Sequence, residues 1–304
     1  MTEKLWSALS NELVQAAEDA GRSVVAVHGS HHPASGVLLE SNAVVTVNHA
    51  TRREEEVRVV LSAGERVSAR VAGRDPGTDL AVFRLQQPVT SAPPPRWSAD
   101  AKLRIGELTL AVARSWRGNV VASSGVISGL IQGPWRTGRG GELDQFVRPD
   151  LTMYPGFSGG PLLNSQGDFV GINTMGLHRS GITVPASTVI RVVRALLEKG
   201  RVERPYLGLA MQGVTLPESL RSKLNLISGE GLLVVHVEPG SPAEKAGVLL
   251  GDTLLEIGGK SVADTDAVQD ALRSHQIGSE VEALFIRGGA TAKVKVKLAP
   301  RVVG

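Results

Sequence analysis

Short strands separated by glycine are the feature that most limits the folds open to this chain. Between Ser23 and about Val184 the sequence repeats short apolar or alternating runs, such as "SVVAVH", "AVVTV", "LAVFRL" and "DFVGIN". Glycine supplies 35 of the 304 residues, whereas aromatic residues make up only 4%. Many short strands with turn signals and almost no helix predict a β-sandwich or a β-barrel for this part of the chain.

The N-terminal segment, residues 1–22, has a different pattern. Trp6, Leu9, Leu13 and Ala17 recur at helical spacing, and Gly21 follows as a stop signal, so we expect an amphipathic helix. The apolar side favours docking on the domain that follows; contact with another subunit is the alternative. Acidic residues interrupt the segment, so it does not read as a signal peptide. As a complete chain the protein would be cytoplasmic; a periplasmic or envelope location is the alternative if an export segment has been removed.

The length and a second helical signal suggest two domains. "STVIRVVRALLEKG" predicts a helix capped by Ser187 or Thr188 and ended by Gly200. We therefore expect a first domain over 23–200, a linker over 201–205 and a second domain over 206–304. The second domain mixes strands with helices expected at "PESLRSKLN", "SPAEKAG" and "DTDAVQDALRSHQ".

A serine lies between glycines in "PGFSGGPLLN" and raises the question of a nucleophile. The G-x-S-x-G elbow of α/β-hydrolases requires a helix after the serine. Here Pro161 and the turn "NSQGD" between two apolar runs predict a hairpin instead. The local context of Ser158 therefore excludes that elbow.

The remaining arrangement has a histidine and a carboxylate upstream of the serine. His49 ends the apolar run "AVVTVNH", and Asp79 stands at the start of "LAVFRL". A serine hydroxyl needs an imidazole to take its proton, and the imidazole needs a carboxylate to fix its tautomer. Each residue alone would usually be structural, but the three together predict base, orienter and nucleophile. The glycines allow the amides of Gly156 and Ser158 to point at a developing oxyanion.

These motifs resemble those of the HtrA (Deg) serine proteases. The resemblance runs from about Ser23 to Leu298 and is carried by "VNHAT", "TDLAVFRL", "SSGVISGL", "GFSGGPLLN" and "GDFVGINT". It implies a mainly β fold, a chymotrypsin-like double six-stranded β-barrel followed by a small α+β PDZ domain. It also implies an ATP-independent endopeptidase for unfolded or damaged proteins and a homotrimer. A catalytically idle peptide-binding chaperone or scaffold is the alternative. By resemblance Gly133–Gln145 is a sensor loop that links peptide binding to the active site; a mobile surface loop is the alternative.

The chain departs from the family at Phe157, where asparagine is usual. The oxyanion hole is expected at Gly156, Phe157 and Ser158, and backbone amides are the donors, so we expect activity to be retained. The interval from His49 to Asp79, 79 − 49 = 30 residues, leaves no room for a long inhibitory loop after the histidine.

The substrate side-chain pocket is expected around the segments before and after the serine loop. By resemblance its base falls at Thr152, which is not a carboxylate, so trypsin-like specificity is not expected. We predict cleavage after small or medium aliphatic residues. The predicted pocket residues are Thr152, Met153, Ile172, Asn173 and Met175.

The second domain carries "RPYLGLAMQGV", which resembles the carboxylate-binding loop and strand of a PDZ domain. A peptide C-terminus would add as a strand beside this segment, its carboxylate held by backbone amides. Val268 and Leu272 would form the opposite wall or simply belong to the core. The predicted peptide-binding residues are Arg204, Tyr206, Leu207, Gly208, Leu209, Met211, Val268 and Leu272.

Composition excludes several function classes. The chain has no cysteine, so disulfides and thiolate metal sites are absent. The net charge is only +3, and the sequence contains no basic stripe, so we expect no nucleic-acid partner. No segment has the apolar length that a membrane span needs, and no Walker motif supports ATP coupling. We expect no cofactor and no metal, because His31, His32, His178, His236 and His275 lack ligand spacing.

Overall fold

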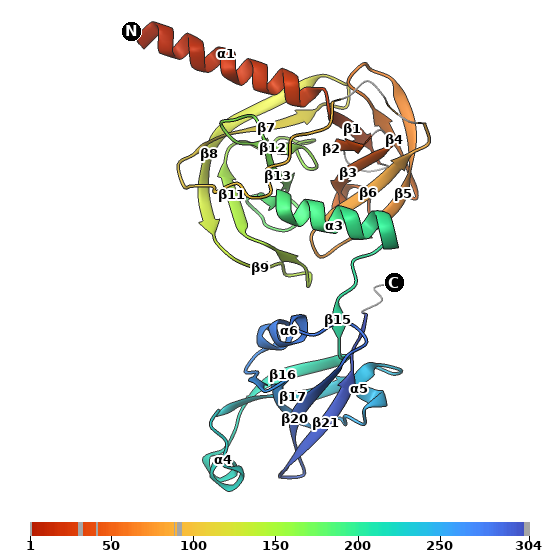
Figure 1. Cartoon of the computed structure of the whole chain (residues 1–304), viewed down its shortest axis with the longest axis vertical. Coiled ribbons are helices and arrows are strands. Elements are labelled where there is room, and N and C mark those ends of the chain that lie inside the picture. Colours follow the sequence, from red (N-terminus) through yellow and green to blue (C-terminus); the bar gives the residue numbers. More distant parts are fainter. Residues whose placement is uncertain (1, 30–32, 41, 88, 90–92, 301–304) are drawn as a thin grey trace. The chain divides into compact units, whose positions relative to one another are not determined.

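The computed structural model describes the whole chain except residues 1, 30–32, 41, 88, 90–92 and 301–304. Contacts divide it into two units, the first ending at Val202 and the second beginning at Glu203 (Figure 1). This division falls inside the segment 201–205 that the sequence suggests as a linker.

Six strands of the first unit close into an N-terminal barrel in the order β1-β2-β3-β6-β5-β4. Every neighbouring pair is antiparallel. The strands of this barrel coincide with runs that the sequence predicts as strands, and every residue of β3 is buried. The strands are β1 (Val24–His28), β2 (Pro33–Glu40), β3 (Ala43–Val47), β4 (Glu56–Val60), β5 (Arg66–Asp75) and β6 (Leu80–Leu85).

Six more strands close a second barrel in the order β11-β14-β13-β12-β7-β8, so the predicted double six-stranded barrel is confirmed. The predicted hairpin after Ser158 is confirmed too, because β12 pairs antiparallel with β13 and the Asn164 amide donates to the Asp168 carbonyl across the turn at 3.1 Å. One core cluster contains residues of both barrels, Val45 and Leu80 with Leu163 and Val184. The strands are β7 (Leu108–Arg114), β8 (Val120–Ile131), β11 (Phe146–Asp150), β12 (Pro161–Leu163), β13 (Phe169–Thr174) and β14 (Ile182–Pro185).

The N-terminal helix α1 (Thr2–Gly21) contacts β1, β7 and β8 (Figure 1). Leu13 and Ala17, on the predicted apolar side, pack against the core of the barrels. Leu5 and Trp6 are 71% and 72% exposed. The helix therefore docks through its C-terminal half and leaves its N-terminal apolar residues uncovered.

Helix α3 (Ala186–Lys199) ends at Gly200 as predicted, with Gly200 at φ 73°. The predicted cap is wrong, because Pro185 holds the N-cap position and no side chain caps the helix. Ser187 and Thr188 lie inside the first turn. The Thr188 hydroxyl accepts instead from the Asp144 amide at 2.9 Å, which ties the helix to the preceding loop.

The second unit contains a sheet in the order β16-β17-β18-β20-β21, with β19 paired to β18. A second pairing joins β15 to β22. Helices form at all three predicted segments of this unit. The elements are β15 (Pro205–Tyr206), β16 (Leu209–Thr215), α4 (Glu218–Leu224), β17 (Glu230–Val237), α5 (Pro242–Lys245), β18 (Thr253–Ile257), β19 (Lys260–Ser261), α6 (Thr265–Arg273), β20 (Glu280–Arg287), β21 (Ala290–Lys297) and β22 (Ala299–Pro300).

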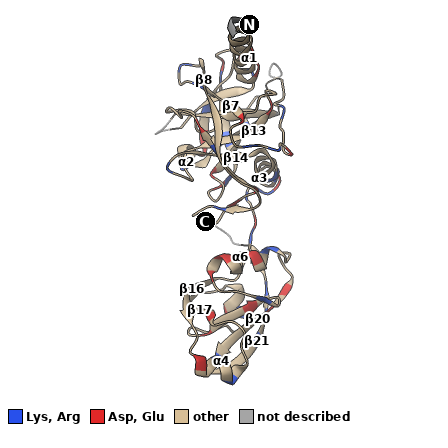
Figure 2. Ribbon diagram, turned by 90° about the vertical axis from the view of Figure 1, so that its left-hand side faces the viewer, with Lys and Arg blue, Asp and Glu red and all other residues tan. Residues whose placement is uncertain are grey.

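Charged residues of both signs are scattered through both units (Figure 2). No helix in the described part of the chain is long and apolar enough to cross a membrane.

Candidate active site

The first barrel brings His49 and Asp79 together through strand pairing. Strand β3 leads into the short helix α2 (Asn48–Thr51), which carries His49, and Asp79 comes directly before β6. Because β3 and β6 pair with Val47 opposite Leu80, the two residues meet at one end of the pair. The His49 Nδ1 atom lies 2.6 Å from Asp79 Oδ2, and the His49 amide donates to Asp79 Oδ1 at 2.9 Å. An ionised carboxylate only accepts, so the Nδ1 atom carries the proton and Nε2 remains as an acceptor.

Asp79 is held in one position from several sides. Its side chain is fully buried, and its backbone has φ 59°, a left-handed conformation that aspartate tolerates better than most residues. The Asn48 amide donates to the Asp79 carbonyl at 2.8 Å, and the Thr174 hydroxyl donates to Asp79 Oδ2 at 2.5 Å. A Cβ added at Gly176 would lie 2.3 Å from Asp79 Oδ2 and 2.6 Å from His49 Nδ1. Only glycine therefore fits over this pair.

The loop before Ser158 begins with a tight turn. The Phe157 amide donates to the Tyr154 carbonyl at 3.0 Å, and Gly156 has φ 98°. Proline at the second position and a glycine of positive φ at the third are typical of a type II turn. The sequence "YPGF" therefore explains the local backbone directly.

Two amides of this loop are left without an acceptor. Those of Phe157, Gly159 and Gly160 donate to backbone carbonyls at 3.0, 2.8 and 3.1 Å. Within the described residues, the amides of Gly156 and Ser158 donate no hydrogen bond. Two free amides on one loop are what a developing oxyanion requires. Of the three residues predicted for an oxyanion hole, Phe157 has its amide used by the turn and its side chain in the core of the second barrel.

Ser158 itself lies in the second barrel and is 8% exposed. Its hydroxyl oxygen accepts from the Met175 amide at 3.3 Å and, in the described structure, makes no hydrogen bond with His49. Gly176, the next residue, covers the His49–Asp79 pair. The three predicted catalytic residues therefore converge on the segment 174–176.

Gly159 is required by close approach to the first barrel. It has φ 89°, and a Cβ there would lie 1.9 Å from the Ser35 carbonyl oxygen. The second glycine of "SGG" faces its own barrel in the same way, since a Cβ at Gly160 would lie 2.2 Å from the Val112 carbonyl oxygen.

The predicted pocket residues separate into two groups. A Cβ at Gly181 would lie 2.8 Å from the sulfur atoms of both Met153 and Met175, so these two side chains meet over that glycine. Thr152 is exposed. Ile172 lies in the core shared by the barrels.

The fifth predicted pocket residue, Asn173, is also fully buried. Its side-chain amide donates to the Pro161 carbonyl at 3.0 Å and its oxygen accepts from Thr183 at 2.8 Å. Ile172 and Asn173 are therefore buried in the barrel core. Gly181, which the methionine pair approaches, carries no local signal of this role in the sequence.

The loop 133–145 contacts the turn that precedes Asp79. It forms a small hairpin from β9 (Trp135–Arg136) and β10 (Glu142–Leu143). The Thr137 hydroxyl donates to the Gly77 carbonyl at 2.7 Å, and a Cβ at Gly141 would lie 2.1 Å from Gly77. Arg139 Nη1 lies 3.9 Å from Asp79 Oδ1. No local feature of the sequence marks this contact between the loop and the buried carboxylate.

In the second unit, β16 lies at an edge of the sheet and pairs only with β17 among the described strands. Gly208, just before it, has φ 83°. The amides of Leu207 and Gly208 donate no hydrogen bond within the described chain. Leu209 and Met211 are partly exposed on β16. These features are those that a strand-adding peptide with a terminal carboxylate would use.

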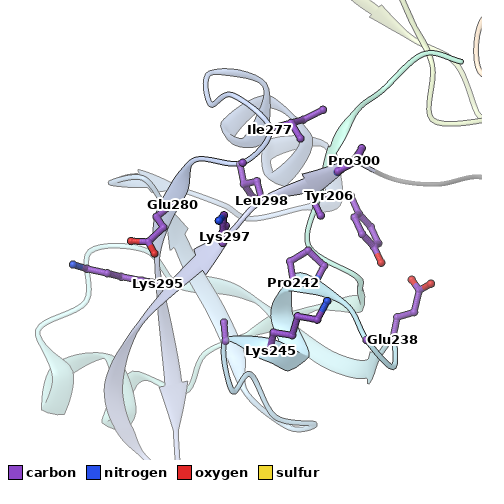
Figure 3. Close-up of a pocket in the computed structure, with 14 residues that line it drawn as sticks. Tyr206, Glu238, Pro242, Lys245, Ile277, Glu280, Lys295, Lys297, Leu298 and Pro300 are labelled. Carbon is purple, nitrogen blue, oxygen red and sulfur yellow. The ribbon is translucent and has the colours of Figure 1, made fainter. Parts of the chain in front are cut away.

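The helix predicted as the opposite wall is tightly packed. Val268 and Leu272 on α6 are each 1% exposed and belong to the core of the second unit, which is the alternative left open by the sequence. Tyr206 lines a cavity of about 590 Å³ that none of the other predicted peptide-binding residues lines. Its hydroxyl also lies beside the predicted carboxylate loop, 3.3 Å from the place of a Cβ at Gly208. Figure 3 shows this cavity with Pro242 and Leu298 near Tyr206, and with lysine side chains around it.

The described residues contain no group of three or more His, Asp or Glu able to hold a metal ion. His178 instead contacts the Ser180 hydroxyl at 2.8 Å, and His275 contacts the Ala271 carbonyl at 3.0 Å. His31 and His32 lie outside the described residues.

Comparison with family models agrees with this architecture. Residues 34–172 match a trypsin-like peptidase domain and residues 205–298 match a PDZ domain. The fold and the site thus define a trypsin-like serine peptidase linked to a PDZ domain.

Individual relatives narrow the class. The chain is 34% identical to the serine protease Do-like HtrA of Lactobacillus helveticus over 87% of its length and 68% of the relative. It is 33% identical to a probable periplasmic serine endoprotease, DegP-like, of Brucella suis over 75% of its length, but this covers 44% of that relative. A solved HtrA-type protease, AlgW with a decapeptide, superposes with a TM-score of 0.76 over 96% of this chain and 99% of that one, at 23% identity.

The chain belongs to the HtrA family of serine proteases. The relatives are named proteases, which supports the predicted peptidase over an idle scaffold.

Proposed function

We propose that this chain is an ATP-independent serine endopeptidase that hydrolyses unfolded or damaged proteins. Ser158 is the nucleophile, His49 the general base, and Asp79 the carboxylate that orients the imidazole. The observation that supports this proposal best is the pair of free amides at Gly156 and Ser158. Their loop contacts the segment 174–176 through Ser158, and the same segment covers the His49–Asp79 pair.

The reaction follows from the atoms present. The Ser158 oxygen attacks the peptide carbonyl carbon while His49 Nε2 takes the hydroxyl proton, and the amides of Gly156 and Ser158 bind the oxyanion. His49 then gives the proton to the leaving amine, and the peptide C–N bond breaks to leave an ester on Ser158. Water, deprotonated by His49, attacks this ester. His49 then returns the proton to the Ser158 oxygen as the ester C–O bond breaks, and the acid is released.

Labelling with a fluorophosphonate tests the assignment of the nucleophile. The wild-type chain should be labelled and should cleave unfolded casein, whereas Ser158→Ala should do neither at equal folding. A wild-type protein that neither labels nor cleaves, while still binding peptide C-termini, would instead be a scaffold.

We further propose that the pocket accepts small or medium aliphatic side chains. The thioethers of Met153 and Met175 over Gly181 offer an apolar surface, and Thr152 supplies no charge for a basic side chain. A peptide library should show Val, Ala, Ile or Leu at the cleaved position. A profile dominated by Lys or Arg would contradict the proposal.

The second unit is proposed to bind peptide C-termini by strand addition to β16, with the carboxylate on the amides of Leu207 and Gly208. AlgW, an HtrA-type protease of similar fold, was solved with a decapeptide. Binding measured by fluorescence anisotropy should be lost when the peptide C-terminus is amidated. Equal affinity for the free acid and the amide would argue for a different mode.

Assembly and location are further parts of the proposal. A homotrimer would cover the exposed Leu5 and Trp6 of α1, and light scattering after gel filtration should give three times the chain mass. We expect Leu5→Glu combined with Trp6→Glu to lower this mass. The name of the Brucella relative favours an envelope compartment over the cytoplasm, which fractionation of the native host would check.

A further inference from the structure

Ser35 on β2 contacts the serine loop of the other barrel through two separate groups. Its side chain is fully buried. The Ser35 amide donates to the Ser158 carbonyl at 2.9 Å, and the Ser35 hydroxyl donates to the Gly156 carbonyl at 2.7 Å. Ser35 therefore donates to the carbonyls of Gly156 and Ser158, the two residues whose amides are free.

The direction of the hydroxyl bond is set by a third contact. The Arg114 amide donates to the Ser35 oxygen at 2.9 Å. Since a hydroxyl has a single proton, the Ser35 oxygen accepts from Arg114 and donates to Gly156. The Thr46 hydroxyl donates to the Ser35 carbonyl at 2.6 Å, so the polar groups of Ser35 are fully engaged.

This contact bears on the orientation of the Gly156 amide. The peptide unit from the Gly156 carbonyl to the Phe157 amide is held at both ends, by the Ser35 hydroxyl and by the Tyr154 carbonyl. Glycine passes readily between backbone conformations, so nothing intrinsic keeps Gly156 at its φ of 98°. A rotation of this residue would turn its amide away and remove one oxyanion donor.

We propose that Ser35 is a positioning residue of the oxyanion site, acting through the Gly156 carbonyl and not through substrate; the inference rests on the proposed peptidase function. Loss of a complete oxyanion donor costs about 10²–10³-fold in kcat. Loss of its positioning should cost less, and should affect the transition state more than the bound substrate.

Arg114 extends the arrangement to the N-terminal helix. Its buried guanidinium donates to the Val24 carbonyl at 2.6 Å and also to the carbonyls of Gly21 and Gly118. Burial lowers the pKa of this guanidinium, yet it stays charged at neutral pH. These bonds hold the C-terminal end of β7. The backbone amide of Arg114, at that end, in turn donates to the Ser35 hydroxyl oxygen.

The test is Ser35→Ala in the full chain, assayed with a fluorogenic peptide and with a peptidyl boronate that forms a tetrahedral adduct. We expect kcat to fall about 10–100-fold, KM to stay within about twofold, and boronate affinity to fall in parallel with kcat. Ser128→Ala is the matched control, because it also removes a strand hydroxyl that donates to a backbone carbonyl. Its kcat should be unchanged.

Several results would overturn the proposal. If wild type is active and Ser35→Ala keeps its kcat, or loses kcat and substrate binding equally, Ser35 does not position the oxyanion site. Inactivity of the wild type would instead refute the peptidase function. If Ser35→Ala does not fold, Ser35→Cys takes its place, since a thiol fills similar space but donates weakly. Failure of both to fold would make Ser35 a purely structural residue and would also contradict the proposal.

Discussion

The two barrels of the first unit contribute different kinds of groups to one site. The first barrel supplies two side chains, those of His49 and Asp79, which are fixed by hydrogen bonds to each other, to the His49 amide and to the Thr174 hydroxyl. The second barrel supplies Ser158 and, around it, backbone amides whose directions depend on a turn and on glycines. A side chain can be recognised by its type, whereas an oriented amide leaves only an indirect trace in the sequence.

This difference predicts different responses to substitution. In the first barrel, changing one atom of a side chain should abolish its role with little change in fold. In the second barrel, function should respond to backbone conformation, so that even a residue without a side chain, such as Gly156, matters.

The largest effect is expected from the first barrel. Asp79→Asn keeps the shape of the side chain but favours the wrong histidine tautomer, so kcat should fall about 10⁴-fold. Steady-state kinetics with circular dichroism would separate this loss from unfolding. An Asp79→Asn enzyme within tenfold of wild type would show that the carboxylate does not orient His49.

A smaller effect is expected from matched glycine substitutions. Gly176→Ala would force a methyl group against Asp79 and His49, and a displacement of about 1 Å costs on the order of 10²-fold in rate. Gly156→Ala meets no atom within 4 Å, but its positive φ disfavours a side chain, so we expect about a tenfold loss through the backbone.

The control for both is Gly138→Ala. This position has open space around it and is not among the glycines of positive φ. It should keep wild-type activity. A Gly156→Ala enzyme as active as Gly138→Ala would mean that the loop backbone does not limit catalysis.

A still smaller effect should come from the loop 133–145. Thr137→Val removes the hydrogen bond to the Gly77 carbonyl, worth about 1 kcal/mol or roughly a fivefold change. We expect kcat to fall by about that factor with KM unchanged, because the loop supports Asp79 and does not bind substrate. Ser180→Ala, in an exposed turn outside this contact, should leave kcat unchanged. A change confined to KM would place the loop in substrate binding.

The smallest effect is expected in the second unit and depends on pH. Burial alone would raise the pKa of Asp252, but hydrogen bonds from Arg287 and the Leu249 amide hold this pKa below its usual value. A lowered pKa gives stability that is present above the unfolded value of about 3.9 and is lost as pH falls through the folded value.

Asp252→Asn should therefore destabilise this unit by about 1–2 kcal/mol at pH 7, a modest amount because Arg287 is 37% exposed. Below pH 4 the difference should shrink. Hydrogen exchange of β18 and β20 at the two pH values would measure it. A pH-independent difference would exclude the ion pair as its cause.

The parts of the site that depend on residue type and strand order can be predicted from the sequence. His49, Asp79 and Ser158 could be found because polar residues stand at the ends of apolar runs. The type II turn could be anticipated from "YPGF". Ser35 and Thr174 could not, because a serine or threonine inside a strand carries no local sign of a partner more than ninety positions away. The error at Ser187 and Thr188 has a similar cause, since a tertiary contact uses the hydroxyl that local preference assigns to a cap.

The contacts of Arg114 have a consequence for how the chain can be shortened. A boundary at residue 23, which the domain pattern suggests for expression of the barrels alone, would delete the Gly21 carbonyl that this guanidinium holds. A cation buried in the protein interior would then lose one of its three carbonyl partners and the helix that shields it from water. Truncations intended for crystallisation or labelling should therefore keep the last turn of α1, and a shorter chain should be selected only after its thermal stability is compared with that of the intact one.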